Sequence, residues 1–148
     1  MTLQPFSFPN LLTDRPRRRT ILFVEDEPFV REVTTCILES AGFRVFPAFD
    51  VRDAINVYES RTEKIDLLLT DMMLPGGSGQ QLGEDLRLRS PEIVILVTSG
   101  YSDLQEEIES SAARRYFLAK PYSRRTLVDK IETILPVLPL ARPATQVG

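Results

Sequence analysis

The sequence contains no histidine and no tryptophan, and it has a single cysteine, Cys36. Without histidine or a second cysteine, the chain lacks the usual nitrogen and sulfur ligands of zinc. The Ser-His-Asp and Cys-His arrangements of hydrolases are excluded for the same reason. One cysteine also rules out an internal disulfide. Because Cys36 falls in an apolar stretch with Val33 and Ile37, we expect it to be a small core residue.

Long hydrophobic runs are also missing. No stretch approaches the roughly 20 apolar residues that a membrane span needs. In the first 19 residues the basic side chains follow the apolar ones, which is the wrong order for a secretory signal, so we expect a cytoplasmic protein. The fractions of hydrophobic (43%) and charged (26%) residues are typical of one globular domain. We expect a flexible basic leader at 1–19, a folded domain at 20–135 and a Pro-rich tail at 136–148.

The charges are unevenly distributed. Arginines 15, 17, 18 and 19 lie together, whereas acidic residues outnumber basic ones in the domain behind them. The arginines suit a solvated leader, or a contact with an anionic partner. The acidic domain argues against direct binding of nucleic acid.

Short apolar runs alternate with amphipathic stretches, which is typical of a parallel sheet covered by helices on both sides. The sequence therefore predicts an α/β domain whose five-stranded parallel sheet is doubly wound by five helices. We expect strands at 20–24, 43–49, 67–70, 93–97 and 116–119, and helices at 28–41, 50–60, 80–89, 102–112 and 123–135.

The helices differ in the strength of their apolar stripes. The first has apolar residues at 29, 33, 37 and 41, and the third has Leu82, Leu86 and Leu88. Ser102 and Gln105 suggest a capping box for the fourth helix. That helix has only three apolar residues in its stripe, so we expect it to be loosely held; they are Leu104, Ile108 and Ala112.

Polar side chains follow four of the predicted strands, and the carboxyl ends of parallel strands share one edge of a sheet, where ligands bind. Carboxylates brought together there repel one another unless a cation lies between them, and oxygen ligands favour Mg²⁺ or Mn²⁺. Each residue alone has an ordinary structural explanation, such as a helix start, a turn cap or a strand position. The converging set comprises Glu25, Asp26, Asp71, Thr98, Ser99 and Lys120.

In its motifs the chain resembles the receiver domain of two-component response regulators, over residues 20–135. The motifs are LFVEDEP at 22–28, LLLTDMMLPGGSG at 67–79, VILVTSG at 94–100 and FLAKP at 117–121. The resemblance implies a flavodoxin-like fold, Asp71 as phosphoacceptor and Lys120 as its cationic partner. It implies Mg²⁺ ligands in Asp26, Asp71, Glu25 (through water) and the Met72 carbonyl. It also implies a switch through Thr98 and Phe117, and a phosphoryl cradle from the N–H groups of Met73 and Ser99.

The resemblance implies a signalling domain rather than an enzyme, one that catalyses only its own phosphorylation and dephosphorylation. The expected partners are a histidine kinase or a histidine phosphotransfer protein, and a downstream protein target. A homodimer through the face of the fourth helix and fifth strand is possible. Only 13 residues follow the last predicted helix, so we expect either a stand-alone regulator or a receiver from a hybrid histidine kinase. The family often has a glycine-containing turn before the fifth strand. This chain has the sequence AARR there, at 112–115.

Two other functions fit parts of the sequence. A receiver fold without phosphorylation would act as a scaffold. A phosphatase of the haloacid-dehalogenase type also uses a strand-end aspartate with Mg²⁺. That class needs a second aspartate two residues later, where this chain has Met73.

Overall fold

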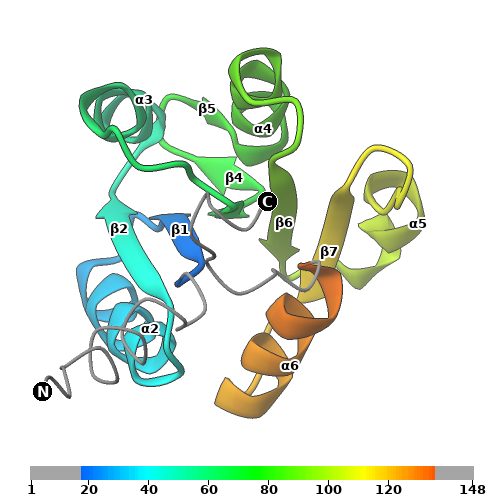
Figure 1. Ribbon diagram of the computed structural model, residues 1–148. Helices are drawn as coiled ribbons and strands as arrows, with labels where there is room; N and C mark the ends of the chain where they lie inside the picture. Colours follow the sequence, from blue (N-terminus) through cyan, green and yellow to red (C-terminus); the bar gives the residue numbers. More distant parts are fainter. Residues whose placement is uncertain (1–17, 136–148) are drawn as a thin grey trace, which may run out of the picture. The chain divides into compact units, whose positions relative to one another are not determined.

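The computed structural model describes residues 18–135, and the predicted leader and tail lie almost wholly outside this range. Five parallel strands form the central sheet in the order β2-β1-β3-β6-β7 (Figure 1). Their bounds are β1 Thr20–Val24, β2 Arg44–Ala48, β3 Leu67–Asp71, β6 Val94–Ser99 and β7 Arg115–Ala119. The short strands β4 (Met73–Leu74) and β5 (Gly77–Ser78) form a hairpin around Pro75 and Gly76.

Within residues 18–135, five α-helices cover the sheet, together with the 3₁₀ turn η1 (Ser102–Leu104). Helices α3 and α4 lie on one face of the sheet, and α2 and α6 lie on the other (Figure 1). The helix bounds are α2 Pro28–Ser40, α3 Val51–Ser60, α4 Gly79–Arg89, α5 Gln105–Ile108 and α6 Arg124–Ile134. No helix in the described part of the chain is long and apolar enough to cross a membrane. The predicted doubly wound α/β fold is confirmed.

The central strands β1, β3 and β6 are buried almost throughout, as expected of parallel strands that helices cover on both sides. Two apolar clusters fill the space between sheet and helices. One contains Ala54, Leu82, Leu86 and Ile108 on the side of α3, α4 and α5. The other contains Leu38, Leu127 and Ile131 on the side of α2 and α6. The polar residues at the carboxyl ends of β1, β3, β6 and β7 therefore lie along one edge of this packed core.

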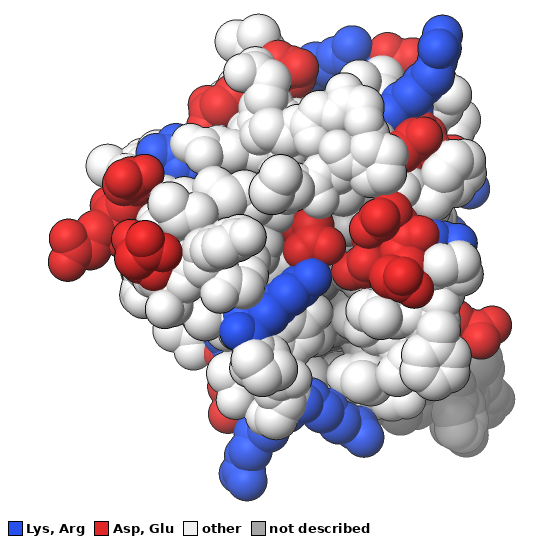
Figure 2. Space-filling model, turned by 180° about the vertical axis from the view of Figure 1, so that it is seen from behind, with Lys and Arg blue, Asp and Glu red and all other residues white. Residues whose placement is uncertain are grey.

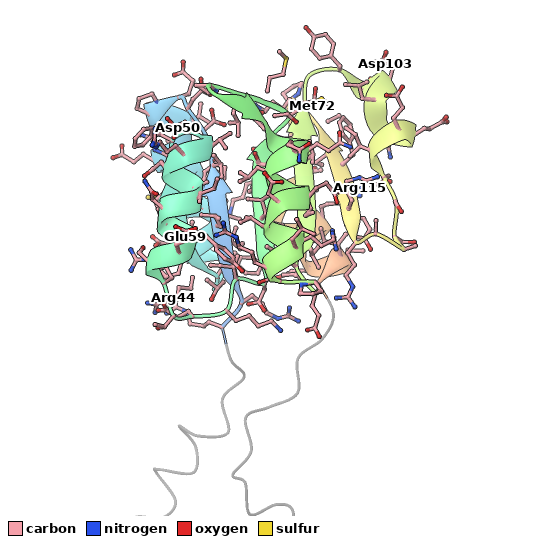
Figure 3. The ribbon with its side chains drawn as sticks, turned by 90° about the horizontal axis from the view of Figure 1, so that it is seen from above. Arg44, Asp50, Glu59, Met72, Asp103 and Arg115 are labelled. Carbon is pink, nitrogen blue, oxygen red and sulfur yellow. The ribbon has the colours of Figure 1, made fainter. Side chains whose placement is uncertain are left out.

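The two edges of the sheet are distinct. Figure 3 shows Asp50, Met72 and Asp103 at one end of the parallel strands, with Arg44 and Glu59 at the other. Helices begin at the first of these edges because each parallel strand ends there, and the following helix returns the chain to the opposite edge, where the next strand begins. Side-chain caps fix three of these starts. Asp50 Oδ1 accepts the Asp53 N–H at 2.7 Å, Ser78 Oγ accepts the Gln81 N–H at 3.1 Å, and Ser123 Oγ accepts the Thr126 N–H at 3.0 Å.

The buried face of α2 differs from the prediction. Phe29 is 73% exposed and Val33 is 40% exposed, whereas Thr34 and Leu38 are buried. The side of α2 that packs on the sheet includes a threonine, and a search for apolar residues alone does not count threonine. The same rotation of the helix leaves Cys36 exposed, so its prediction as a core residue was wrong. At the helix end, Gly42 adopts the left-handed conformation that is typical of a helix cap, with φ of +100°.

The fourth predicted helix is much shorter than expected. After η1, α5 has four residues, and Ala112 lies outside it. The predicted capping box is also wrong, because η1 begins without a side-chain cap. Long-range bonds end α5: Glu109 accepts the Phe117 N–H at 3.2 Å, and Arg115 Nε donates to the Ile108 carbonyl at 2.7 Å. In the following turn, Arg114 takes the left-handed conformation, with φ of +53°. This is the segment in which the family often has a glycine-containing turn.

Helix α4 confirms part of its predicted stripe. Leu82 and Leu86 are buried, but Leu88 is 84% exposed because it follows Leu86 by only two residues and so points to the opposite side.

Candidate functional site

Three carboxylates meet at the carboxyl edge of the sheet. Glu25 and Asp26 follow β1, and Asp71 ends β3, which pairs with β1 in parallel. One carboxylate oxygen from each of the three lies within 4.8 Å of the others. Figure 2 shows acidic side chains gathered near the centre of this face, with a basic side chain alongside. The predicted convergence of these residues is confirmed.

Lys120 and Thr98 complete the surroundings of Asp71. Lys120 Nζ lies 2.6 Å from Asp71 Oδ1, and Thr98 Oγ1 donates to the same oxygen at 3.1 Å. The Asp71 side chain is 14% exposed and that of Lys120 is 34% exposed. Lys120 follows β7 and precedes a cis peptide bond to Pro121. The positive charge of Lys120 is thus in direct contact with one oxygen of the carboxylate, while the pair remains open to solvent.

Burial and crowding affect the protonation of the site. Glu25 is 5% exposed, and its pKa is raised mainly by burial, with further increases from Asp71 and Asp26. The Glu27 N–H, which donates to Glu25 Oε2 at 3.1 Å, and Lys120 act in the opposite direction. Beside them, burial and then the charges of Glu25 and Asp71 raise the pKa of Tyr122 to about 12. Excess negative charge is therefore a property of this edge.

A small cavity of about 190 Å³ opens beside Asp71. It lies where β3 and β6 end, so it is bordered by the carboxylate and by the backbone of both strand ends. Its volume leaves room for a small group such as a phosphoryl group. The lining residues are Asp71, Met72, Met73, Thr98, Ser99, Gly100 and Tyr101.

The sequence did not reveal why Gly79 follows the hairpin. The first residue of α4 packs against the end of β3, and its N–H donates to the Met72 carbonyl at 2.8 Å. A Cβ at position 79 would overlap the Asp71 carbonyl oxygen and lie 2.6 Å from Thr70 Oγ1. Glycine is therefore required by close approach of two backbones. The only sign of this close approach in the sequence was a glycine four residues after Pro75.

The remaining predicted residues are in place, but their roles stay predictions. The Met72 carbonyl already accepts one hydrogen bond, from Gly79, and has a second lone pair for a ligand. Met73 is exposed, and the Ser99 side chain accepts the Tyr101 N–H at 3.0 Å. Phe117 is 2% exposed, so its ring is already inside the core, and the structure records no outward position from which it would turn.

The donor set fits a hard divalent cation. Three carboxylates supply only oxygen ligands, and there is no histidine in the sequence and no cysteine at the site to favour a softer metal. Glu25, Asp26 and Asp71 are the residues that would hold Mg²⁺ or Mn²⁺. Such an ion would neutralise charge that Lys120 alone offsets only in part.

In a comparison with protein families, the chain matches the response regulator receiver domain over residues 21–132. The chain is 32% identical over 116 residues to the sensory transduction protein RegX3 of Mycolicibacterium smegmatis. That match covers 78% of this chain and 50% of RegX3, so the chain spans about half the length of this relative.

Solved structures show the same similarity. The receiver domain of the hybrid histidine kinase CckA is 32% identical, with a TM-score of 0.67, over 79% of this chain and 99% of that one. The response regulator TrrA of Thermotoga maritima, solved in complex with Mg²⁺-BeF, is 26% identical with a TM-score of 0.67, over 79% and 99%. The chemotaxis regulator CheY4 of Vibrio cholerae has a TM-score of 0.70 at 23% identity, over 80% and 100%, which supports the fold.

Proposed function

Because the chain belongs to the response regulator receiver domain family, a class of signalling domains in two-component systems, we propose that it accepts a phosphoryl group on Asp71. One observation supports this above the others. The Asp71 carboxylate has Lys120 Nζ at 2.6 Å and Thr98 Oγ1 at 3.1 Å, and it shares its edge with Glu25 and Asp26. A phosphoryl acceptor needs such positive and hydrogen-bonding groups around a free oxygen.

In the proposed reaction, an Asp71 oxygen attacks the phosphorus of a phosphohistidine on a histidine kinase or histidine phosphotransfer protein. The oxygen–phosphorus bond forms as the phosphorus–nitrogen bond breaks, and the imidazole keeps the electron pair and takes up a proton. Lys120 would pair with the phosphoryl oxygens, and the N–H groups of Met73 and Ser99 would donate to them. A divalent cation bound by Glu25, Asp26 and Asp71, with the Met72 carbonyl, would supply further neutralising charge.

The same residues suggest how phosphorylation is transmitted. Phosphorylation adds about −1.5 to −2 charges beside the Thr98 hydroxyl, which would transfer its hydrogen bond from the carboxylate to a phosphoryl oxygen. Phe117 lies on β7, the neighbour of the strand that carries Thr98, and its N–H is held by Glu109 at the end of α5. We therefore propose α5 and β7 as the surface that changes and that a downstream protein, or a second copy of the chain, recognises.

Acetyl phosphate tests the first step without a kinase. We expect the wild-type protein, incubated with acetyl phosphate and Mg²⁺, to gain the mass of one phosphoryl group, and Asp71→Asn to gain none. Asparagine keeps the shape of the side chain but has no anionic oxygen. Wild type that gains no mass would favour the scaffold function, and equal gain in Asp71→Asn would place the acceptor elsewhere.

The switch has a separate test. Beryllofluoride with Mg²⁺ mimics the phosphoryl group, and amide NMR shifts report where the structure responds. We expect the largest changes away from Asp71 to fall in residues 102–119. Unchanged shifts there would contradict the proposed surface while leaving Asp71 as acceptor.

The haloacid-dehalogenase alternative gains no support. Its general acid would have to be at position 73, where the methionine side chain has no proton to donate.

A further inference from the structure

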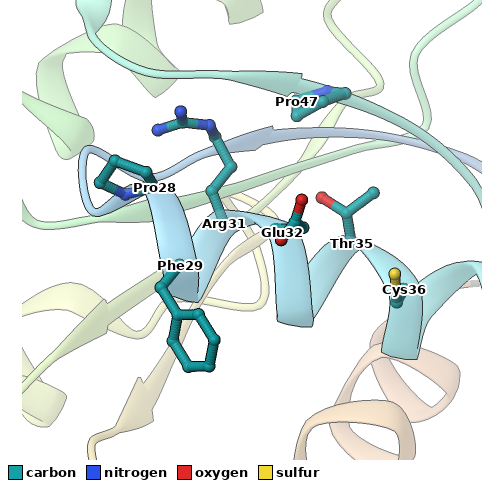
Figure 4. Close-up of a pocket in the computed structure, with 7 residues that line it drawn as sticks. All are labelled: Pro28, Phe29, Arg31, Glu32, Thr35, Cys36 and Pro47. Atoms are coloured by element: carbon teal, nitrogen blue, oxygen red, sulfur yellow. The ribbon is translucent and has the colours of Figure 1, made fainter.

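Arg31 reaches back from α2 to the loop that carries two of the acidic residues. Its Nη1 donates to the Glu25 carbonyl oxygen at 2.7 Å, and its guanidinium carbon lies 6.0 Å from the centre of the Phe49 ring. Figure 4 shows Arg31 extending from α2 on the side of Pro47, opposite to Phe29. The guanidinium therefore links the loop after β1 to the loop after β2.

This contact completes a set of bonds around Glu25. The Glu25 N–H donates to the Ala48 carbonyl at 3.0 Å, and one Glu25 carboxylate oxygen accepts the Glu27 N–H at 3.1 Å. With Arg31 on its carbonyl, Glu25 is fixed at its N–H, its C=O and its side chain. Asp26 is exposed, so the direction of its carboxylate depends on the backbone that these bonds hold.

The nearby carboxylates attract the charge of Arg31, but this charge acts against the start of α2 and against a cation bound at the site. Arg31 lies in the first turn of α2, where the helix dipole disfavours a positive charge. It also lies beside a group of carboxylates suited to a cation, and a positive charge there repels that cation. Electrostatics alone therefore predicts that Arg31 weakens cation binding, whereas its bond to the Glu25 carbonyl predicts that it strengthens cation binding.

We propose that Arg31 is a positioning residue for the divalent-cation site, one that holds the loop Glu25–Glu27 so that Glu25 and Asp26 face Asp71. The inference rests on the proposed function, since it assumes that these carboxylates bind Mg²⁺. Arg31 itself contacts neither the cation nor the phosphoryl group. Its effect passes through the backbone of Glu25.

The sign of the effect on Mg²⁺ affinity separates this role from simple electrostatics. Removing a nearby positive charge should strengthen cation binding, whereas loss of a positioning contact should weaken it, by about 10-fold for an outer contact of this kind. We therefore expect Arg31→Met, which keeps the aliphatic stem, to bind Mg²⁺ about 10-fold more weakly than wild type. Arg52→Met is the matched control, because Arg52 is exposed in the first turn of α3 and its removal changes the net charge equally.

Affinities are measured by titrating MgCl₂ at constant ionic strength and following the amide NMR shifts of Asp71 and Met72. We expect Arg52→Met to bind as tightly as wild type or slightly more tightly, and Arg31→Lys, which keeps a donor and a charge, to recover part of the loss. Arg31→Met that binds Mg²⁺ as tightly as wild type overturns the inference and leaves the proposed function standing. Wild type that binds no Mg²⁺ overturns both.

Thermal unfolding separates positioning from a general loss of stability. A cation that binds only the folded state raises the melting temperature. We expect the increase in melting temperature from EDTA to one fixed, sub-saturating Mg²⁺ concentration to be smaller in Arg31→Met than in wild type. A variant that melts lower in EDTA but gains the full Mg²⁺-dependent increase would have only a structural defect, and the inference would be wrong.

Discussion

Replacing Gly79 by alanine tests the packing that holds Asp71. Taken alone, alanine at the start of a helix should stabilise the protein by roughly 0.5–1 kcal/mol, because it favours helix and restricts the unfolded chain. In the folded protein, however, the new Cβ would overlap the Asp71 carbonyl oxygen and crowd the Thr70 side chain. Neither neighbour can yield easily, since both belong to the buried end of β3. Overpacking of this kind costs about 1–3 kcal/mol, so the net effect should be destabilising.

With the helix gain subtracted, we expect Gly79→Ala to lower the free energy of unfolding by about 1 kcal/mol, and the melting temperature by about 4 °C for a domain of this size. Urea unfolding followed by circular dichroism measures the first quantity. Gly100→Ala is the matched control: a Cβ added at that position would meet nothing within 4 Å, and its stability should stay within about 0.5 kcal/mol of wild type. A Gly79→Ala protein as stable as wild type, or more stable, would refute the account of how the end of β3 is fixed.

Two further predictions concern carboxylates with opposite pKa shifts. Burial raises the pKa of Glu25, so its charged form destabilises the folded state, and the penalty grows as pH rises through its folded pKa. Glu25→Gln should therefore unfold at a higher temperature than wild type at pH 7 in EDTA, and the difference should shrink towards pH 4. Glu109 is the reverse: burial would raise its pKa, but hydrogen bonds from Lys130, the Phe117 N–H and Gln105 outweigh burial and lower it. Its stabilisation is present above the unfolded pKa and is lost as pH falls through the lowered folded pKa, so Glu109→Gln should be about 1–2 kcal/mol less stable at pH 7 and should approach wild-type stability only below that folded pKa. Melting curves against pH check both, and a parallel shift at all pH values would contradict either.

The sheet and the strand-end residues could be predicted because a strand that is buried on both faces is apolar throughout. Its assignment does not depend on deciding which face packs against the core. The runs at β1, β3 and β6 are apolar on both sides, so recognising them as parallel strands was enough to bring Asp26 and Asp71 to one edge. The predicted ends of β3 and β6 were one and two residues too early. In the structure, Asp71, Thr98 and Ser99 therefore lie within the strands rather than after them. That difference did not move their side chains from the edge.

Helix faces were harder to predict because each depends on angular position around an axis. In α2 the apolar pattern selected Phe29 and Val33, but the side packed on the sheet includes Thr34. A threonine methyl fills space in a core much as valine does, yet counts as polar in a sequence pattern. With α2 turned in this way, the side chain of Arg31 is directed towards the Glu25 carbonyl. The error in the helix face thus hid a contact next to the candidate site.

The length of α5 could not be predicted from the sequence at all, because its end is set by residues distant along the chain. Glu109 is extended rather than helical, and its carboxylate receives Lys130 Nζ from α6 at 2.9 Å as well as the Phe117 N–H. Arg115 of β7 donates to the Ile108 carbonyl and also pairs with Glu84 of α4 at 3.0 Å. These bonds anchor the end of α5 firmly, whereas residues 102–107 are mostly exposed. A change at Thr98 or Phe117 would therefore displace the start of α5 more readily than its end, since local opening is easiest where few buried contacts must break.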